Sequence, residues 1–148
     1  MPDSGHWTLF LFKGLALVPT MARTEAGLYM GIEPVEVVDA RDHAAVQQAL
    51  MRAISRGNPS VPTPSRANFP KNPLLKYTKL KSDSSFDKLT KSWNLSKRDG
   101  AYFIVPYRLR QDSGKEEDVE RGEAIPAEEP LEVVVRRLVR RALESDER

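Results

Sequence analysis

Five prolines lie within residues 57–73 (GNPSVPTPSRANFPKNP), and this segment limits the possible folds more than any other. Each proline removes a backbone N–H donor and pushes the residue before it out of the helical conformation, so no long helix can pass through. The segment is predicted to be an extended loop or a linker. A linker would divide the chain in two, but 148 residues is the usual size of one domain and neither half would have a comfortable core. We therefore expect a single domain over residues 1–148.

Before this segment, the hydrophobic pattern predicts two strands. Residues 7–12 and 28–38 are rich in aromatic and β-branched side chains, which favours strands, with a loop through residues 19–27 between them. Pro34 cannot donate to a ladder, so it predicts a sheet edge or a break. Two alternatives stay open for residues 1–27: they fold into the domain as a strand, or they form a loosely attached N-terminal extension.

Strands are also predicted in the second half of the chain. Residues 74–80 (LLKYTKL) alternate as a half-buried strand does. Asp99 and Gly100 can supply the positive φ angles of a tight hairpin turn, which leads into a strand over residues 101–109. A further strand is predicted at residues 120–125.

Helical spacing predicts three helices. The first runs from about Asp42 and ends at Gly57. The second is short and covers residues 86–93, with Ser84 or Ser85 as its N-terminal cap. The third begins at Pro130. Together with the strands, these helices indicate an α+β (mixed α/β) domain with about five or six strands and about three helices. The apolar positions of the first helix are Val46, Ala49, Leu50, Ala53 and Ile54.

Charge is divided along the chain although the net charge is only +2. Residues 1–55 carry a net −2, residues 56–110 a net +9 and residues 111–148 a net −5. Within the last part, residues 112–132 contain nine acids against two bases. We interpret this run as a solvated acidic loop, which can steer the chain toward a basic partner and raise the rate of encounter.

The sequence has none of the common signatures of catalysis. There is no cysteine, which excludes disulfides, thiolate nucleophiles and cysteine metal ligands. The two histidines, His6 and His43, have no partner at metal-ligand spacing, and the phosphate-loop, HExxH and GxSxG motifs do not occur. We predict no catalytic residue, no metal and no cofactor, and hence a protein that is not an enzyme. An acid-based nuclease or hydrolase that uses the carboxylate run stays as an alternative.

The longest apolar stretch, residues 7–18, does not predict a membrane span. It is interrupted by Lys13 and Gly14 and falls short of the roughly 20 residues that cross a bilayer. Residues 1–6 lack the basic start of a secretory signal. We expect a cytoplasmic protein with no membrane partner, and the absence of cysteine fits a reducing compartment.

The basic segment, residues 56–110, suggests a second hypothesis. Its lysines and arginines are interleaved with aromatic rings, a combination that binds single-stranded nucleic acid. The same rings also fall where a core must be filled, and lysine commonly guards exposed strand edges. The core interpretation is our main expectation, and an RNA- or DNA-binding module is the alternative. The rings concerned are Tyr77, Phe86, Trp93, Tyr102 and Tyr107.

Several short stretches between residues 31 and 110 resemble small bacterial immunity proteins of contact-dependent growth inhibition systems. They are GIEPVEV (31–37), RGNPSVPTP (56–64), LLKY (74–77), KSW (91–93) and RDGAYFIVPYR (98–108). The resemblance implies a cytoplasmic protein that binds the C-terminal toxin domain encoded beside it and neutralises that domain without chemistry of its own. Toxins of such systems are often nucleases, so the implied partner has a basic groove built for phosphates.

Two faces could meet such a toxin, and the sequence does not choose between them. In one, carboxylates imitate the phosphates of a nucleic acid and occupy the groove. In the other, Trp93 and Tyr107 anchor the contact beside the groove, because aromatic residues dominate interface hot spots. The acidic candidates are Asp112, Glu116, Glu117, Asp118, Glu120 and Glu123.

Overall fold

The computed structural model of the protein describes residues 4–112 and 114–146, so residues 1–3 of the N-terminal segment lie outside it. Its centre is an eight-stranded sheet in the order β3-β2-β1-β5-β6-β7, with β4 beside β2 and β8 beside β6. All pairs are antiparallel except β2–β4. The strands are β1 (Gly5–Phe12), β2 (Leu15–Thr24), β3 (Tyr29–Asp39), β4 (Ser60–Val61), β5 (Lys91–Arg98), β6 (Ala101–Leu109), β7 (Lys115–Glu117) and β8 (Glu123–Pro126).

Four α-helices accompany the sheet in the part of the chain that the structure describes: α1 (His43–Arg56), α2 (Leu75–Thr78), α3 (Asp83–Leu89) and α4 (Leu131–Asp146). The predicted α+β class and the single domain are confirmed. The strand count is higher than predicted because β2, β4 and β7 were not among the predicted strands. β4 and β7 have only two and three residues, and strands that short show no period in the sequence.

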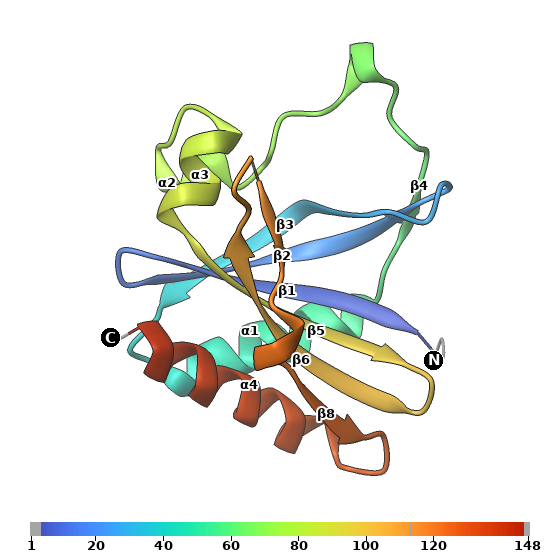
Figure 1. Cartoon of the computed structure of the whole chain (residues 1–148), viewed down its shortest axis with the longest axis vertical. Helices are drawn as coiled ribbons and strands as arrows, with labels where there is room; N and C mark the ends of the chain where they lie inside the picture. The colour runs from blue at the N-terminus through green and yellow to red at the C-terminus, as the bar shows by residue number, and fades with distance from the viewer. Residues whose placement is uncertain (1–3, 113, 147–148) are drawn as a thin grey trace.

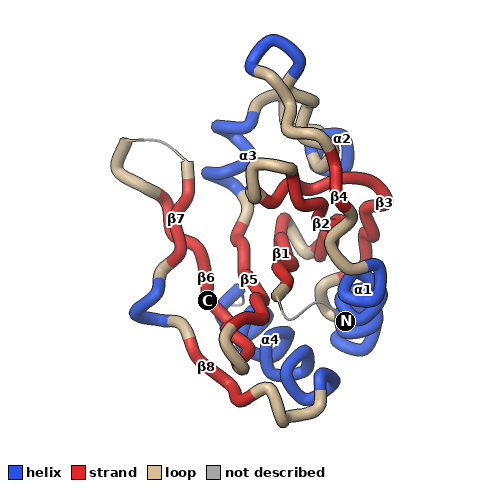
Figure 2. The backbone as a smooth tube through the Cα atoms, turned by 90° about the vertical axis from the view of Figure 1, so that its right-hand side faces the viewer, coloured by secondary structure: helices blue, strands red, loops and turns tan. Residues whose placement is uncertain are grey.

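The two long helices cover one face of the sheet. α1 and α4 contact each other, α1 packs on β1, β2 and β3, and α4 packs on β5 and β6 (Figure 2). Alternation along β1 decides which side chains reach this layer: Trp7, Leu9 and Leu11 join the core with α1 and α4. Leu50 of α1 and Leu138 of α4 are fully buried there. Burial of such side chains is worth roughly 1.5–3 kcal/mol each.

The opposite face is covered only in part. Residues 57–73, which we call the strap, leave the end of α1 and arch over the sheet toward α2 and α3 (Figure 1). A second, smaller core lies under α2 and α3, where Phe86 packs near Phe12 and Leu17. The remainder of this face stays open.

β1 and β2 start as a hairpin and then diverge, which opens the sheet beside β1 (Figure 1). They pair only over residues 10–12 and 15–17; farther along, β1 pairs with β5, and β2 with β3. Asn58 of the strap bridges the gap. Its Oδ1 accepts from His6 N at 3.2 Å, and its Nδ2 donates to His6 O and Met21 O, both at 2.9 Å. Backbone groups released from the ladder therefore find partners in the strap.

The N-terminal residues are central to the fold. Of the two alternatives for residues 1–27, residues 5–24 fold in as β1 and β2, in the middle of the sheet. The predicted loop over residues 19–27 is wrong up to Thr24. Pro19 lies beyond the pairs between β1 and β2, and the register with β3 shifts between Pro19 and Thr20, so an irregularity accommodates the missing N–H.

Two predictions around residue 80 are wrong. Residues 74–80 form the helical turn α2 rather than a strand, because Leu74 and Leu75 are both buried and Lys79 ends the turn with φ 61°. The next helix starts earlier than predicted, since Ser82 caps it by accepting from Ser85 N, and it ends at Leu89. Trp93 consequently lies in β5.

The other predicted elements are confirmed. β1 and β3 cover the first two predicted strands, and β3 lies at a sheet edge, as Pro34 indicated. α1 is capped by Asp42 and followed by Gly57, and Asp99 and Gly100 join β5 to β6 with positive φ angles. The strand predicted at residues 120–125 is present as β8, which begins at Glu123.

Candidate functional site

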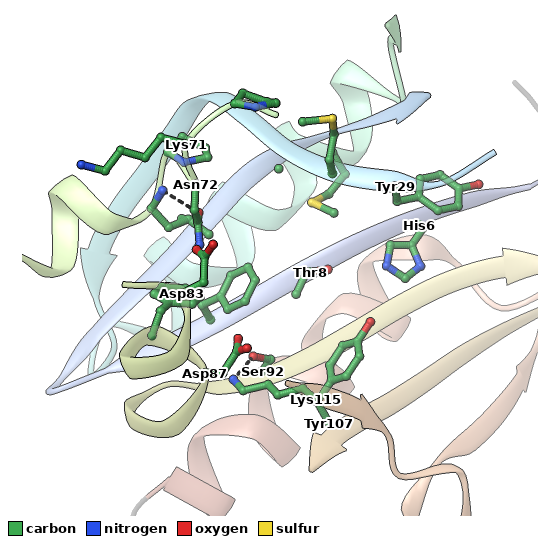
Figure 3. A pocket seen from close by; sticks show the side chains of 18 of the residues that line it. His6, Thr8, Tyr29, Lys71, Asn72, Asp83, Asp87, Ser92, Tyr107 and Lys115 are labelled. Carbon is green, nitrogen blue, oxygen red and sulfur yellow. Dashed lines mark hydrogen bonds between the residues drawn. The ribbon is translucent and has the colours of Figure 1, made fainter. Parts of the chain in front are cut away.

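The open face of the sheet contains a cleft of about 420 Å³ (Figure 3). Its floor is formed by β1, β5 and β6, and its walls by β3, the strap, α3 and β7. Phe69 of the strap is 68% exposed at this cleft, so an apolar side chain is available at its edge. The remaining lining residues are His6, Thr8, Phe10, Met21, Tyr29, Met30, Gly31, Pro70, Lys71, Asn72, Pro73, Leu74, Asp83, Phe86, Asp87, Ser92, Tyr107 and Lys115.

A chain of hydrogen bonds crosses the floor of the cleft. Thr8 Oγ1 donates to Asn94 Oδ1 at 2.8 Å, and Asn94 Nδ2 donates to Tyr107 Oη at 2.6 Å. Burial and the charge of Glu117 raise the pKa of Tyr107 to about 12. The phenol therefore stays protonated, and because its oxygen accepts from Asn94, its own proton can be donated to a ligand in the cleft.

Lys115 reaches into the cleft from β7. Its Nζ donates to Ser92 Oγ at 2.7 Å, to Thr90 O at 2.8 Å and to Thr90 Oγ1 at 2.9 Å. Burial lowers the pKa of this amine to about 8, and nearby Asp87 opposes the shift. The pKa of the Asp87 carboxyl is itself raised by burial.

His6 lies at the other end of the cleft. Its ring stacks on Tyr29 with centroids 4.7 Å apart and planes 18° apart, and its Nδ1 is 3.4 Å from Ser96 Oγ. Burial lowers the pKa of His6 to about 4, so the ring is neutral at pH 7. His43, in contrast, is exposed at the start of α1.

The predicted acidic residues lie on and around β7, which with the following residues we call the acidic arm (residues 115–120). The expected loop is instead a strand and a short 3₁₀ turn, and Glu116, Glu117 and Glu120 are exposed there, as expected. Tyr107 pairs with Glu117, and Arg108 with Glu116. Residues opposite each other in an antiparallel pair share a face, so Glu117 shares the cleft side with Tyr107, while Glu116 is on the other side with Arg108.

Most of the predicted carboxylates are paired with arginines. Arg108 contacts Glu116 at 3.4 Å and Asp118 at 3.7 Å, and Arg110 contacts Asp112 at 3.1 Å. Within residues 4–112 and 114–146, Glu117 and Glu120 make no ion pair. The negative field of this region is thus weaker than the sequence count implies, and it is concentrated on these two residues.

Glu123 lies on β8 and contacts two arginines of α4 instead. Arg137 and Arg141 both form ion pairs with it. The hydrogen bond from Arg137 is the largest cause that lowers the pKa of the Glu123 carboxyl, and the charges of both arginines lower it further. The guanidinium of Arg141 also lies 5.0 Å from the centre of the Trp93 ring. Trp93 is only 3% exposed and packs in the main core, so it presents no side chain to a partner. Of the two predicted aromatic anchors, only Tyr107 lines the cleft.

The basic segment does not form a continuous element of the structure. Residues 56–110 extend over the end of α1, the strap, α2, α3, β5 and β6. Several of its cations pair with carboxylates, among them Arg56 with Glu36, Lys76 with Glu33, Arg108 with Glu116 and Asp118, and Arg110 with Asp112. Nucleic-acid binding by this segment stays a prediction.

The cleft offers apolar contacts and hydrogen bonds, together with the charged side chains of Lys71, Asp83 and Asp87. His6 is neutral, Tyr107 stays protonated, and all three protons of the Lys115 ammonium group are donated to protein oxygens. Among the residues that the structure describes, no group of three or more histidine or acidic side chains could hold a metal ion. No helix in the described ranges is long and apolar enough to cross a membrane.

Sequence reasoning missed most of the cleft. Thr8, Asn94 and Lys115 are polar residues on strands, and only the pairing of β1, β5, β6 and β7 brings them together. One signal was present: Thr8 alternates with apolar neighbours on β1, which indicates a polar position on the face opposite the main core.

Two solved structures share this fold. One is the Protein of Unknown Function NMB0488 from Neisseria meningitidis, with a TM-score of 0.66 and 11% identity over 96% of this chain and 94% of that chain. The other is a chain of the CdiA-CT/CdiI toxin and immunity complex from Yersinia pseudotuberculosis, with a TM-score of 0.62 and 12% identity over 97% of both chains. The fold is common to all three proteins. No family model and no curated protein matches the sequence.

Proposed function

We propose that this protein is an immunity protein of a contact-dependent growth inhibition system. It binds the cognate C-terminal toxin domain, a basic nuclease, in the cytoplasm and neutralises that domain without chemistry of its own. The observation that carries the proposal is the shared fold with a chain of a toxin and immunity complex over 97% of both chains. The resemblance of residues 31–110 to immunity proteins supports it independently.

The cleft and the acidic arm are the proposed contact surface. Glu117 and Glu120 are exposed and free of ion pairs among the described residues, and Tyr107 lines the adjoining cleft. Asp112, Glu116, Asp118 and Glu123 contribute less, because each must leave an arginine before it can meet a partner. Trp93 acts only by supporting the core.

Co-expression tests the proposal. The C-terminal domain of the exoprotein encoded beside this gene should arrest growth when expressed alone, and growth should resume when this protein is expressed with it. The purified pair should bind with nanomolar affinity, on the order of −12 kcal/mol. A toxin domain from an unrelated system, which this protein should not neutralise, is the control. Growth arrest that persists while the protein accumulates in folded form would contradict the proposal.

A further inference from the structure

β7 is a short edge strand. It has three residues and, among the described residues, pairs with the end of β6. Short edge pairs of this kind open readily, because they bury few apolar groups and expose their backbone hydrogen bonds. Side-chain contacts therefore contribute to the order of the acidic arm, and the ion pairs of Arg108 with Glu116 and Asp118 are among them.

The Lys115 side chain provides such a contact. It runs from β7 to the junction of α3 and β5, where its ammonium group donates three hydrogen bonds of 2.7–2.9 Å to Thr90 and Ser92. Figure 3 shows Lys115 beside Ser92. Both acceptor residues are buried. Hydrogen bonds from a charged donor contribute about 1.5–3 kcal/mol. Burial of the ammonium group, which lowers its pKa to about 8, offsets part of this gain.

The side of the strand on which Lys115 lies also determines the side on which the Glu117 side chain lies. Side chains two residues apart on a strand share a face, so Lys115 and Glu117 both lie on the cleft side. The neighbours Glu116 and Asp118 are engaged by Arg108 on the other side. Glu117 is left beside Tyr107, close enough for its charge to raise the pKa of the phenol.

We propose that Lys115 is a positioning residue: it ties the acidic arm to the α3–β5 junction so that Glu117 stands at the rim of the cleft beside Tyr107, ready to meet a basic side chain of the partner. The contact of Lys115 with the α3–β5 junction is a property of the free protein. The contact of Glu117 with a basic side chain of the partner rests on the proposed function.

Hydrogen exchange in the free protein tests the tie. In Lys115→Met, the hydrogen-bonded amides of the acidic arm should exchange about tenfold faster than in the parent; that of Asp118, which donates to Pro106 O at 2.7 Å, is the reporter. Amides of β1 and β5 should keep their protection, which shows that the fold is intact. Ser92→Ala, which removes an acceptor at the other end, should act in the same direction. Lys88→Met, an exposed lysine on α3, is the matched control. If the amides of the acidic arm exchange as slowly in Lys115→Met and Ser92→Ala as in the Lys88→Met control, the proposal is overturned.

Association with the toxin domain tests the role of Glu117. Glu117→Gln and Lys115→Met should each slow association by about two- to fivefold, the size expected of one exposed charge. If Lys115 acts through Glu117, Lys115→Met should add nothing in the Glu117→Gln background, whereas it should still slow association in Glu116→Gln. Independent effects at Lys115 and Glu117 would refute the positioning role. If no toxin binds, the proposed function fails, and the exchange measurement still decides whether the tie exists.

Discussion

His6 shows how one side chain changes character when the chain folds. In the sequence it is an isolated histidine near the N-terminus, with no chemical partner. In the structure it is half-buried on β1, stacked on Tyr29, and its backbone is bonded to Asn58. Burial without an acidic partner disfavours the imidazolium form, which is why its pKa falls to about 4.

The folded protein should therefore lose stability through His6 as the pH falls. The pKa of an unfolded histidine is about 6.5, so between about pH 6.5 and pH 4 the unfolded state binds more protons than the folded state. The contribution is fully present above pH 6.5, and about 3 kcal/mol is lost by pH 4. Denaturant unfolding of His6→Phe should show a weaker decline between pH 7 and pH 4.5 than the parent. His43→Phe, which changes an exposed histidine, should decline as the parent does.

At the level of the elements, the proline-rich strap holds two strands of the sheet together. It closes the sheet where β1 and β2 part, through Asn58 and through Gly57 O, which accepts from Trp7 Nε1 at 3.3 Å. Prolines suit such a connection because they reduce the conformational entropy of the unfolded chain. They also have no backbone N–H group that would need a hydrogen-bond acceptor.

Replacing Asn58 should weaken this closure. Asn58→Ala leaves His6 N, His6 O and Met21 O without their side-chain partner, and we expect a loss of about 1–3 kcal/mol in the free energy of unfolding. Asn68→Ala, on the exposed part of the strap, should change stability by less than about 0.5 kcal/mol. Both are measured by urea unfolding at pH 7. Equal effects of the two substitutions would mean that Asn58 does not hold the strands together.

At the scale of the whole molecule, charge is divided less sharply than the sequence suggests. Arg108 and Arg110 of the basic segment neutralise carboxylates of the acidic one, because β6 and its following turn bring them together. Within the acidic arm, the carboxylates that form no ion pair among the described residues are Glu117 and Glu120. If they steer a basic toxin, their effect must depend on salt, since exposed charges are screened within about 10 Å at 0.1 M ionic strength.

Charge reversal at these two residues should slow toxin association at low salt. Glu117→Lys with Glu120→Lys should reduce the association rate at 20 mM salt by roughly tenfold, and the difference should largely vanish at 500 mM salt. Glu128→Lys with Glu129→Lys changes the net charge equally but lies before α4, away from the cleft. Stopped-flow association kinetics make the comparison. Equal slowing by both pairs would place the contact elsewhere.

Local patterns determined much of this protein in advance. The apolar spacing of Val46 to Ile54, the Asp99-Gly100 turn and the proline at residue 130 predicted α1, the β5–β6 hairpin and α4, because each signal acts within a few residues. The α+β class followed from these elements. Pro34 also predicted an edge strand correctly, since a missing N–H is a local property.

Only the tertiary structure decided the cleft and the true distribution of charge. Leu74 and Leu75 form a helical turn rather than a strand because a second core beneath α2 and α3 buries both of them, and no seven-residue pattern reveals that core. Lys115, Ser92, Thr8 and Tyr107 lie on four different strands, and the acids of the arm meet arginines that pairing of β6 with β7 brings beside them. Such contacts depend on strand pairing between distant segments, which is fixed by the packing of the whole chain rather than by any one part of it.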